Sequence, residues 1–254
     1  LVRLWLLLVR NSNRTRLYIL RRLSFSEAAF FVRFAKKQFN RQQRMKSVKV
    51  MLLGASLLML SACGQQVQKE SEATVTEKSN SEAVIETILS RRSVRKYKKA
   101  QISDEDLYLI LQAGTYAASG HGLQPCTIVV IQDTDTLARL SALNAKIMGT
   151  TNDPMYGAPT VLLVLADMEK SPNAWSDGCL ILGNLMNAAA SLHLGSCWIN
   201  RAKEEFETPE GKALLKEWGL PEHLVGVGHC IVGYGDGPEP AAAPRKPDFI
   251  KFVK

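Results

Sequence analysis

The segment from Met45 to Cys63 limits what this chain can fold into. It begins with Lys46 and Lys49 and continues with the largely apolar run Val50–Leu60. That run is too short for a transmembrane helix, which needs about 20 apolar residues. Small residues stand directly before Cys63. A positive start, a short apolar run and small residues, in this order, are typical of an export signal that is removed from the mature protein. We therefore expect the chain to fold after this segment.

The end of the segment, Leu60-Ser61-Ala62-Cys63, resembles the bacterial lipoprotein signal, in which the cysteine is lipidated and becomes the new N-terminus. The resemblance implies a signal peptide over residues 45–62 and a lipid anchor at Cys63. It also implies a place in the bacterial cell envelope, facing outside the cytoplasm. A plain secretory signal and a buried helix with a chance cysteine are the alternatives.

Residues 1–44 stand before this signal, begin with Leu1 and are strongly basic. A basic segment of this length is unusual before an export signal. We interpret residues 1–44 as an upstream segment assigned to the protein in error, with Met45 as the initiator. The rival interpretation is a basic amphipathic helix over residues 25–39 that lies on a membrane surface.

The net charge of +8 and the pI of about 9.3 would favour a nucleic-acid binder if the charge were spread evenly. Residues 1–50 hold 13 of the 32 basic residues and 1 of the 24 acidic ones, Glu27, which leaves 19 basic and 23 acidic residues for 51–254. The remainder is mildly acidic. We therefore expect no nucleic-acid partner.

Residues 63–81 are polar and contain no aromatic side chain, so they predict a flexible tether. The folded domain is expected over 82–254, a length that suits one domain. Four cysteines lie in this domain without a CxxC pair, which argues against a zinc site and leaves their disulfide state open. They are Cys126, Cys179, Cys197 and Cys230.

Apolar periodicity predicts alternating strands and helices in the domain. We expect buried strands at 127–131, 159–166 and 224–232, and helices at 81–90, 103–114, 137–147 and 174–194, with a further helix that Thr208 caps and Pro209 begins. None of the common phosphate-binding or hydrolase motifs is present, which excludes the usual nucleotide-binding and hydrolase classes.

Three arginines follow the first helix in the run 90–97, Ser-Arg-Arg-Ser-Val-Arg-Lys-Tyr. Guanidinium groups and a hydroxyl suit a phosphate or the edge of a planar ring, although a basic run is more often a solvated face. A second motif, 117–126, has small residues that let the backbone approach a flat ligand, with Ser119 and Gln124 as polar contacts. His121 in this loop is expected to form a hydrogen bond rather than to bind a metal.

Two further motifs follow: Gly-Ser-Cys-Trp-Ile-Asn-Arg at 195–201, and Gly-Tyr-Gly at 233–235 with Arg245 and Lys246 beyond it. In this order and spacing, together with Asp177 and Asn184 on the long helix, the motifs resemble the nitroreductase family of flavoenzymes. The resemblance implies an α+β fold of three layers, with a mixed central sheet flanked by helices. It also implies a homodimer with FMN bound at its interface.

The resemblance further implies how FMN is held. Arg91, Arg92, Ser93 and Arg95 would hold the phosphate, the ribityl chain and the pyrimidine edge, and Arg245 would complete the phosphate site. The backbone at Asn200 and Arg201 would face the flavin N5. Ser119 and Gly120 would contact the FMN of the other subunit, beside Gln124. Three family residues differ here: the Pro is Ala118, the Asn is Gly122 and the Trp is Cys126. The loss of that Asn leaves flavin tuning open.

The implied activity is ping-pong transfer of two electrons, as hydride, from a reduced donor such as NAD(P)H to a nitroaromatic, quinone or similar small acceptor. The flavin carries this chemistry, so no side chain is named as catalytic. One alternative is a dehalogenase-like flavoenzyme of the same superfamily, with residues 144–157 as its lid. The other is a flavin-binding lipoprotein without catalytic activity.

Overall fold

The computed structural model describes residues 5–11, 14–20 and 79–254. The chain divides into two units, Leu1–Val75 and Thr76–Lys254, which are described separately. In the first unit, β1 (Trp5–Asn11) and β2 (Arg14–Leu20) form an antiparallel hairpin, in a segment for which we expected no strand. The predicted signal peptide, Cys63 and the alternative helix over 25–39 lie outside the described residues.

The second unit is built on a sheet of four strands in the order β3-β4-β6-β5. The strands are β3 (Cys126–Ile131), β4 (Thr160–Ala166), β5 (Gly195–Ile199) and β6 (Val225–Gly233). All three neighbouring pairs are antiparallel. The prediction of a mixed sheet therefore differs from the structure. The crossover from β4 to β5 makes these two strands run in the same direction, but β6 lies between them.

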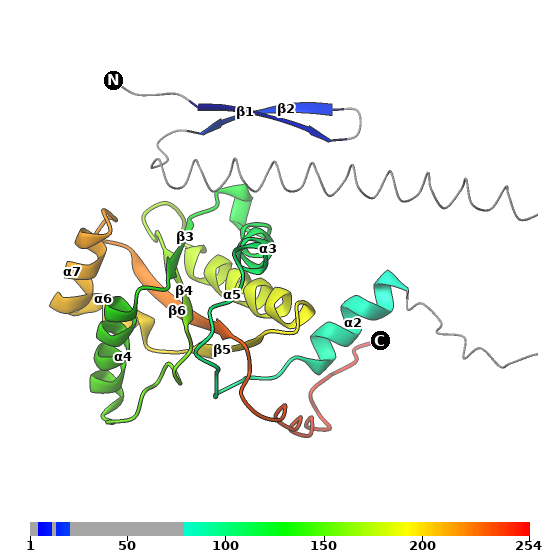
Figure 1. Ribbon diagram of the computed structural model, residues 1–254. Helices are drawn as coiled ribbons and strands as arrows, with labels where there is room; N and C mark the ends of the chain where they lie inside the picture. Colours follow the sequence, from blue (N-terminus) through cyan, green and yellow to red (C-terminus); the bar gives the residue numbers. More distant parts are fainter. Residues whose placement is uncertain (1–4, 12–13, 21–78) are drawn as a thin grey trace, which may run out of the picture. The chain divides into compact units, whose positions relative to one another are not determined.

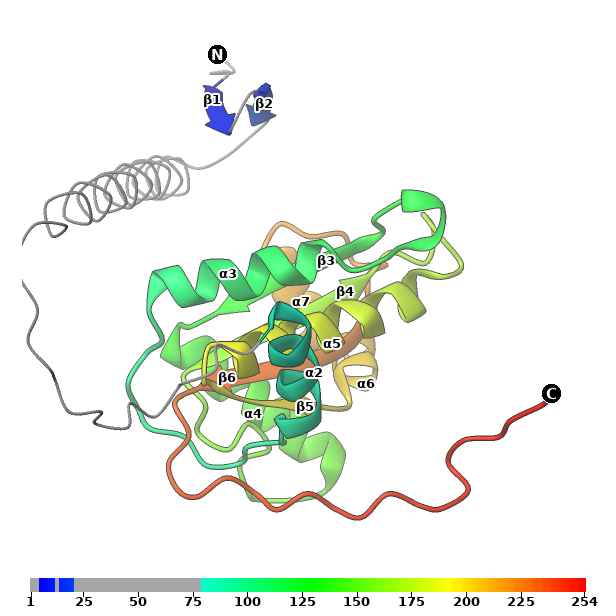
Figure 2. The ribbon, with the colours of Figure 1, turned by 90° about the vertical axis from the view of Figure 1, so that its right-hand side faces the viewer.

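Helices cover both faces of this sheet and give the predicted three layers of an α+β fold (Figures 1 and 2). The helices are α2 (Asn80–Ser90), α3 (Asp104–Thr115), α4 (Thr134–Met148), α5 (Ala174–Ser191), α6 (Ala202–Glu207) and α7 (Pro209–Glu217), with a short 3₁₀ turn, η1 (Gly120–Gly122). Helices α3 and α5 pack on one face, and α4, α6 and α7 pack on the other.

Strand β4 separates the two halves of the core. Leu162 and Val164 point to the α3 and α5 side, whereas Val161 and Leu163 point to the α4, α6 and α7 side. All four are fully buried. Side chains alternate between the faces of a strand, so an unbroken apolar run predicts a strand covered on both faces. This explains why β4 and β6 could be predicted as buried strands. Strand β3 was also expected to be buried, but it lies at the edge of the sheet, and its Thr127 and Val130 are exposed.

The helix starts follow capping rules. Ser103 caps α3, and Thr208 caps α7 with Pro209 at its first position, as predicted. Helix α2 is capped by Ser79 rather than by Asn80 or Ser81, because Ser79 and Glu82 form a reciprocal capping box. Among the described residues, no helix has both the length and the apolar character needed to cross a membrane.

The segment 144–157, the expected lid of the dehalogenase alternative, is held in place. Its first part is the end of α4, which continues to Met148. The Asp153 carboxylate then accepts hydrogen bonds from the Ser141 hydroxyl and from the backbone N–H groups of Met155 and Gly157. The Met155 side chain is buried. This packing gives the lid interpretation no structural support.

Candidate functional site

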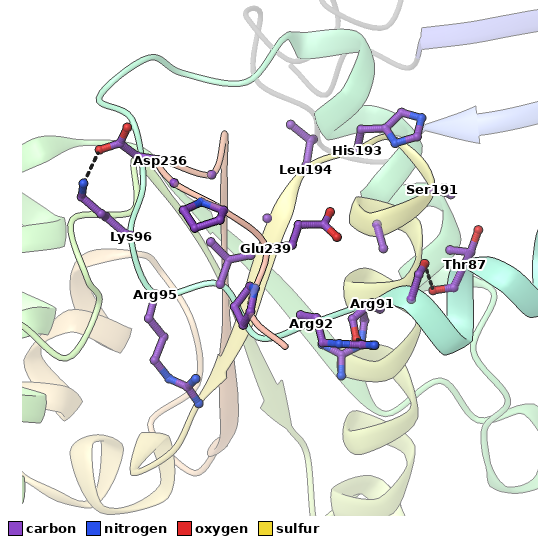
Figure 3. A pocket seen from close by; sticks show the side chains of 18 of the residues that line it. Thr87, Arg91, Arg92, Arg95, Lys96, Ser191, His193, Leu194, Asp236 and Glu239 are labelled. Carbon is purple, nitrogen blue, oxygen red and sulfur yellow. Dashed lines mark hydrogen bonds and ion pairs between the residues drawn. The ribbon is translucent and has the colours of Figure 1, made fainter. Parts of the chain in front are cut away.

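A cleft of about 800 Å³ lies where the end of α2, the loop after it and the segment 235–240 meet. Its volume is within the range of small-molecule sites. Arg91, Arg92 and Arg95 all line it, and we call it the basic cleft (Figure 3). The wall opposite the arginines carries Glu239. The first sequence motif thus forms one side of a single cleft.

Arg91 is the arginine best prepared to bind an anion. Its side chain is half-buried, and its Nη1 is buried with no hydrogen-bond partner among the described residues. Buried polar groups are normally satisfied, so this nitrogen indicates a missing acceptor. Arg92, by contrast, donates through Nη1 to the carbonyl oxygens of Leu89 (2.8 Å) and Arg91 (2.9 Å). Part of its bonding capacity is therefore already used at the end of α2.

The arginine segment is tied to the sheet and to the opposite wall. Ser93 and Ser196 form an isolated parallel bridge, in which the Val94 N–H donates to the Ser196 carbonyl oxygen at 3.0 Å. The Lys96 ammonium lies 3.1 Å from the Asp236 carboxylate. These links fix the backbone of the cleft while the exposed Arg95 side chain keeps its freedom. The nearest contact of its Nη1 is the Ser93 carbonyl oxygen, at 3.5 Å.

Ser119 and Gln124 lie elsewhere, in a cleft of about 370 Å³ between the 117–126 loop and α5. The buried Asp177 carboxylate anchors this loop by accepting the Gly120 N–H at 3.1 and 3.2 Å. The Ser119 hydroxyl accepts the Gln124 N–H at 3.2 Å. His121 and Gln124 both have positive φ, at 52° and 48°. Residues other than glycine seldom adopt this conformation, and it clusters at ligand sites.

Cys126 also lines this second cleft. Burial, with smaller contributions from nearby Asp177 and Cys179, raises the pKa of its thiol to about 11. The protonated thiol donates to the Ala174 carbonyl oxygen at 3.2 Å. All four cysteines of the described residues are free thiols. Cys126 therefore acts as a small half-buried residue where the family has Trp.

Asn200 and Arg201 form a third location, the turn between β5 and α6. Arg201 has φ +77°, in the left-handed region. The buried Asn144 side chain of α4 holds this turn. Its Nδ2 donates to the Asn200 carbonyl oxygen, and its Oδ1 accepts from Arg201 Nε, each at 2.9 Å. Neither residue of the turn lines the basic cleft.

Two more buried polar residues stand behind Asn144. Its Nδ2 also donates to Glu205 Oε1 of α6. Glu205 Oε2 lies 3.0 Å from Nε2 of His229 on the central strand β6. Both side chains are fully buried, yet this contact is not aligned as a hydrogen bond. Neither ring nitrogen has a hydrogen-bond partner among the described residues. We call Asn144, Glu205 and His229 the buried polar chain.

The structure does not bring Arg245 to the basic cleft. The segment 241–254 is fully exposed and contains no helix or strand, and it runs away from the sheet in Figure 2. Its apolar side chains are mostly exposed, although the Phe249 ring lies 5.7 Å from the Lys246 ammonium. The other predicted contacts lie at three places: the basic cleft, the cleft at Ser119 and the turn at Asn200. Ser93 stands between residues that line the basic cleft but does not line it itself.

The buried polar chain is the feature that sequence reasoning missed. Asn144 falls on the apolar face of α4, near the buried Leu140 and Leu143, and His229 stands in an apolar strand. Polar residues at core positions are uncommon and are usually paired. That rule could have singled out both residues, but it could not have named Glu205 as their partner.

Comparisons with known proteins show which family this chain resembles. The model of the nitroreductase family matches residues 88–150 and 144–234. A protein of Archaeoglobus fulgidus that carries the provisional name NADH dehydrogenase/NAD(P)H nitroreductase is 32% identical over 157 residues, which are 60% of this chain and 86% of that protein. The NADPH-flavin oxidoreductase of Vibrio harveyi is 30% identical over 176 residues, 65% of this chain and 71% of that protein.

Among solved structures, the nitroreductase of Bacteroides fragilis with bound FMN is similar in fold. It is 31% identical, has a TM-score of 0.63, and the match covers 67% of this chain and 98% of that one. The match therefore spans nearly the whole length of the solved protein. Since the family model covers more than half of this chain and the fold agrees, the chain belongs to the nitroreductase family.

Proposed function

We propose that this protein is an FMN-dependent oxidoreductase that transfers two electrons from a reduced donor to a small acceptor. One observation carries the proposal: Arg91, Arg92 and Arg95 line one cleft, and the buried Nη1 of Arg91 has no hydrogen-bond partner among the described residues. A buried cation without an acceptor is costly, and a phosphate would satisfy it. The Bacteroides fragilis relative, which contains bound FMN, supports FMN as the ligand.

The chain's residues fit this cofactor. Arg91 and Arg95 supply charge-assisted donors for the phosphate and the ring edge, while Arg92 also caps the end of α2. The left-handed backbone at Arg201 presents main-chain groups that would contact the ring. Bound FMN would supply the hydride chemistry, and the protein would orient it and place positive charge near it.

A second copy of the chain would bring the three locations together. We propose a homodimer because α2 buries none of its residues and leaves Val84, Ile85, Ile88 and Leu89 at least half exposed. The C-terminal segment 241–254 is exposed in the same way at four apolar residues, Phe249, Ile250, Phe252 and Val253. A monomer seldom leaves this many large apolar side chains in contact with water.

The double substitution Phe249→Ser/Phe252→Ser is expected to weaken self-association by at least about tenfold, since each buried aromatic side chain contributes roughly 1.5–3 kcal/mol. Sedimentation equilibrium measures the change. Met148→Ser, at an equally apolar exposed site on α4, is the matched control and should leave the dimer intact. A protein that is monomeric before any substitution would contradict the proposal.

Donor and acceptor are proposed from the relatives, whose names include NAD(P)H nitroreductase and NADPH-flavin oxidoreductase. The FMN-loaded protein should oxidise NADH or NADPH without oxygen and then pass the electrons to a quinone or a nitroaromatic. Stopped-flow absorbance would show two separate half-reactions if the cycle is ping-pong. Turnover of a halogenated substrate alone would favour the dehalogenase alternative, and the absence of any donor oxidation would favour a flavin-binding protein without activity.

We also propose that Cys63 carries a lipid anchor that holds the protein in the cell envelope. The support is the sequence pattern from Met45 to Cys63. Replacement of Cys63 by serine should move the protein from the detergent phase to the aqueous phase in a phase-partition experiment. Equal partition of the two forms would rule out the anchor.

A further inference from the structure

The turn at Asn200 and Arg201 is held in an unfavourable conformation. A residue with a side chain seldom takes φ +77° unless its surroundings fix it there. Two of the contacts that fix it come from one side chain, because Asn144 donates to the Asn200 carbonyl oxygen and accepts from Arg201 Nε. The Glu205 N–H of α6 adds a backbone hydrogen bond to the Arg201 carbonyl oxygen at 2.9 Å. Asn144 thus connects α4 to the turn across 56 and 57 residues of sequence.

Glu205 and His229 hold Asn144 in turn. The amide of Asn144 donates to Glu205, and the other carboxylate oxygen lies against the His229 ring. A buried carboxylate beside an imidazole whose nitrogens lack aligned partners is an expensive arrangement for a core. Apolar residues of similar size would pack there at lower cost. The cost suggests that the arrangement is kept for the geometry it imposes on the turn.

We propose that Asn144, itself oriented by Glu205 and His229, is a positioning residue. It sets the left-handed turn at Arg201 so that the backbone there contacts the ring of the bound flavin. This inference rests on the proposed function. The inference goes beyond that function by giving a role to three buried residues that line neither the basic cleft nor the cleft at Ser119.

The test compares Asn144→Ala with Asn184→Ala in the full-length protein. Asn184 is a half-buried asparagine that, like the buried Asn144, donates a side-chain hydrogen bond to a backbone carbonyl oxygen, that of Ala113 at 3.0 Å. Both variants should lose thermal stability as apoproteins. Only Asn144→Ala should change the ratio of the dissociation constants for oxidised and reduced FMN, by about tenfold. A tenfold change in that ratio corresponds to a shift of about 30 mV in the midpoint potential of a two-electron couple.

Arg201→Ala removes the other end of the same hydrogen bond at a half-buried position, so it keeps the proposal testable if Asn144→Ala does not fold. It should shift the potential in the same direction, and the double variant should shift it by less than the sum. If all variants bind FMN and Asn144→Ala and Arg201→Ala shift the potential no more than Asn184→Ala, the positioning role is overturned. If the unaltered protein binds no FMN, the proposed function itself fails first.

Discussion

Replacing Arg91 with alanine is expected to raise the dissociation constant for FMN by about 10-fold to 150-fold. A hydrogen bond to a charged group contributes roughly 1.5–3 kcal/mol, and about 1.4 kcal/mol corresponds to a factor of ten. The effect should be large because the Arg91 guanidinium is half-buried and its Nη1 has no other acceptor among the described residues. Titration of the apoprotein with FMN, followed by the quenching of flavin fluorescence, measures the change.

Lys99→Ala is the matched control. It removes one positive charge from the same segment, but Lys99 is exposed and does not line the basic cleft. Its effect on the dissociation constant should be within about twofold, since exposed charges are screened by water and salt. Equal affinities for the Arg91 variant and the unaltered protein would mean that the phosphate is bound elsewhere.

Replacing Gly226 with alanine is expected to destabilise the fold by about 3 kcal/mol and to weaken FMN binding as well. A Cβ at this position of β6 would lie 2.2 Å from the carbonyl oxygen of Ala202 and 2.5 Å from its carbonyl carbon. Both are backbone atoms that cannot turn aside, so α6 must move, and overpacking of this kind costs roughly 1–3 kcal/mol or more. Because Ala202 follows Arg201 directly, the same movement would distort the turn.

Gly183→Ala provides the control for this second prediction. Nothing lies within 4 Å of a Cβ at Gly183, which is inside helix α5. Alanine should therefore stabilise the protein by about 0.5–1 kcal/mol, because glycine is a poor helix former. Urea unfolding monitored by circular dichroism would measure both variants. If the Gly226→Ala protein were as stable as the unaltered one, α6 would be able to move away from the new Cβ without a loss of stability.

The sequence was a good guide where one element could be recognised from its own pattern. The apolar runs of β3, β4 and β6 predict strands, of which β4 and β6 are buried on both faces, and the caps at Ser103 and Thr208 predict helix starts. Strand β5 was missed because Gly195–Ile199 is short and was described only as part of a sequence motif. Its strand character comes from pairing with β6, a contact distant in sequence that no local pattern encodes.

The candidate site was only partly predictable for a related reason. Arg91, Arg92 and Arg95 are neighbours in sequence, and the bridge between Ser93 and Ser196 keeps them in one cleft. Arg245 belongs to an exposed tail whose position depends on what covers it. The buried polar chain joins α4, α6 and β6, so its contacts exist only after three distant segments have packed together.

The visible absorption spectrum of the purified protein most directly tests whether the basic cleft binds FMN. We expect a yellow protein with the absorption bands of bound flavin, from which denaturation releases FMN in an amount equal to that of the chain. A colourless protein that takes up no FMN when the cofactor is added would contradict this expectation.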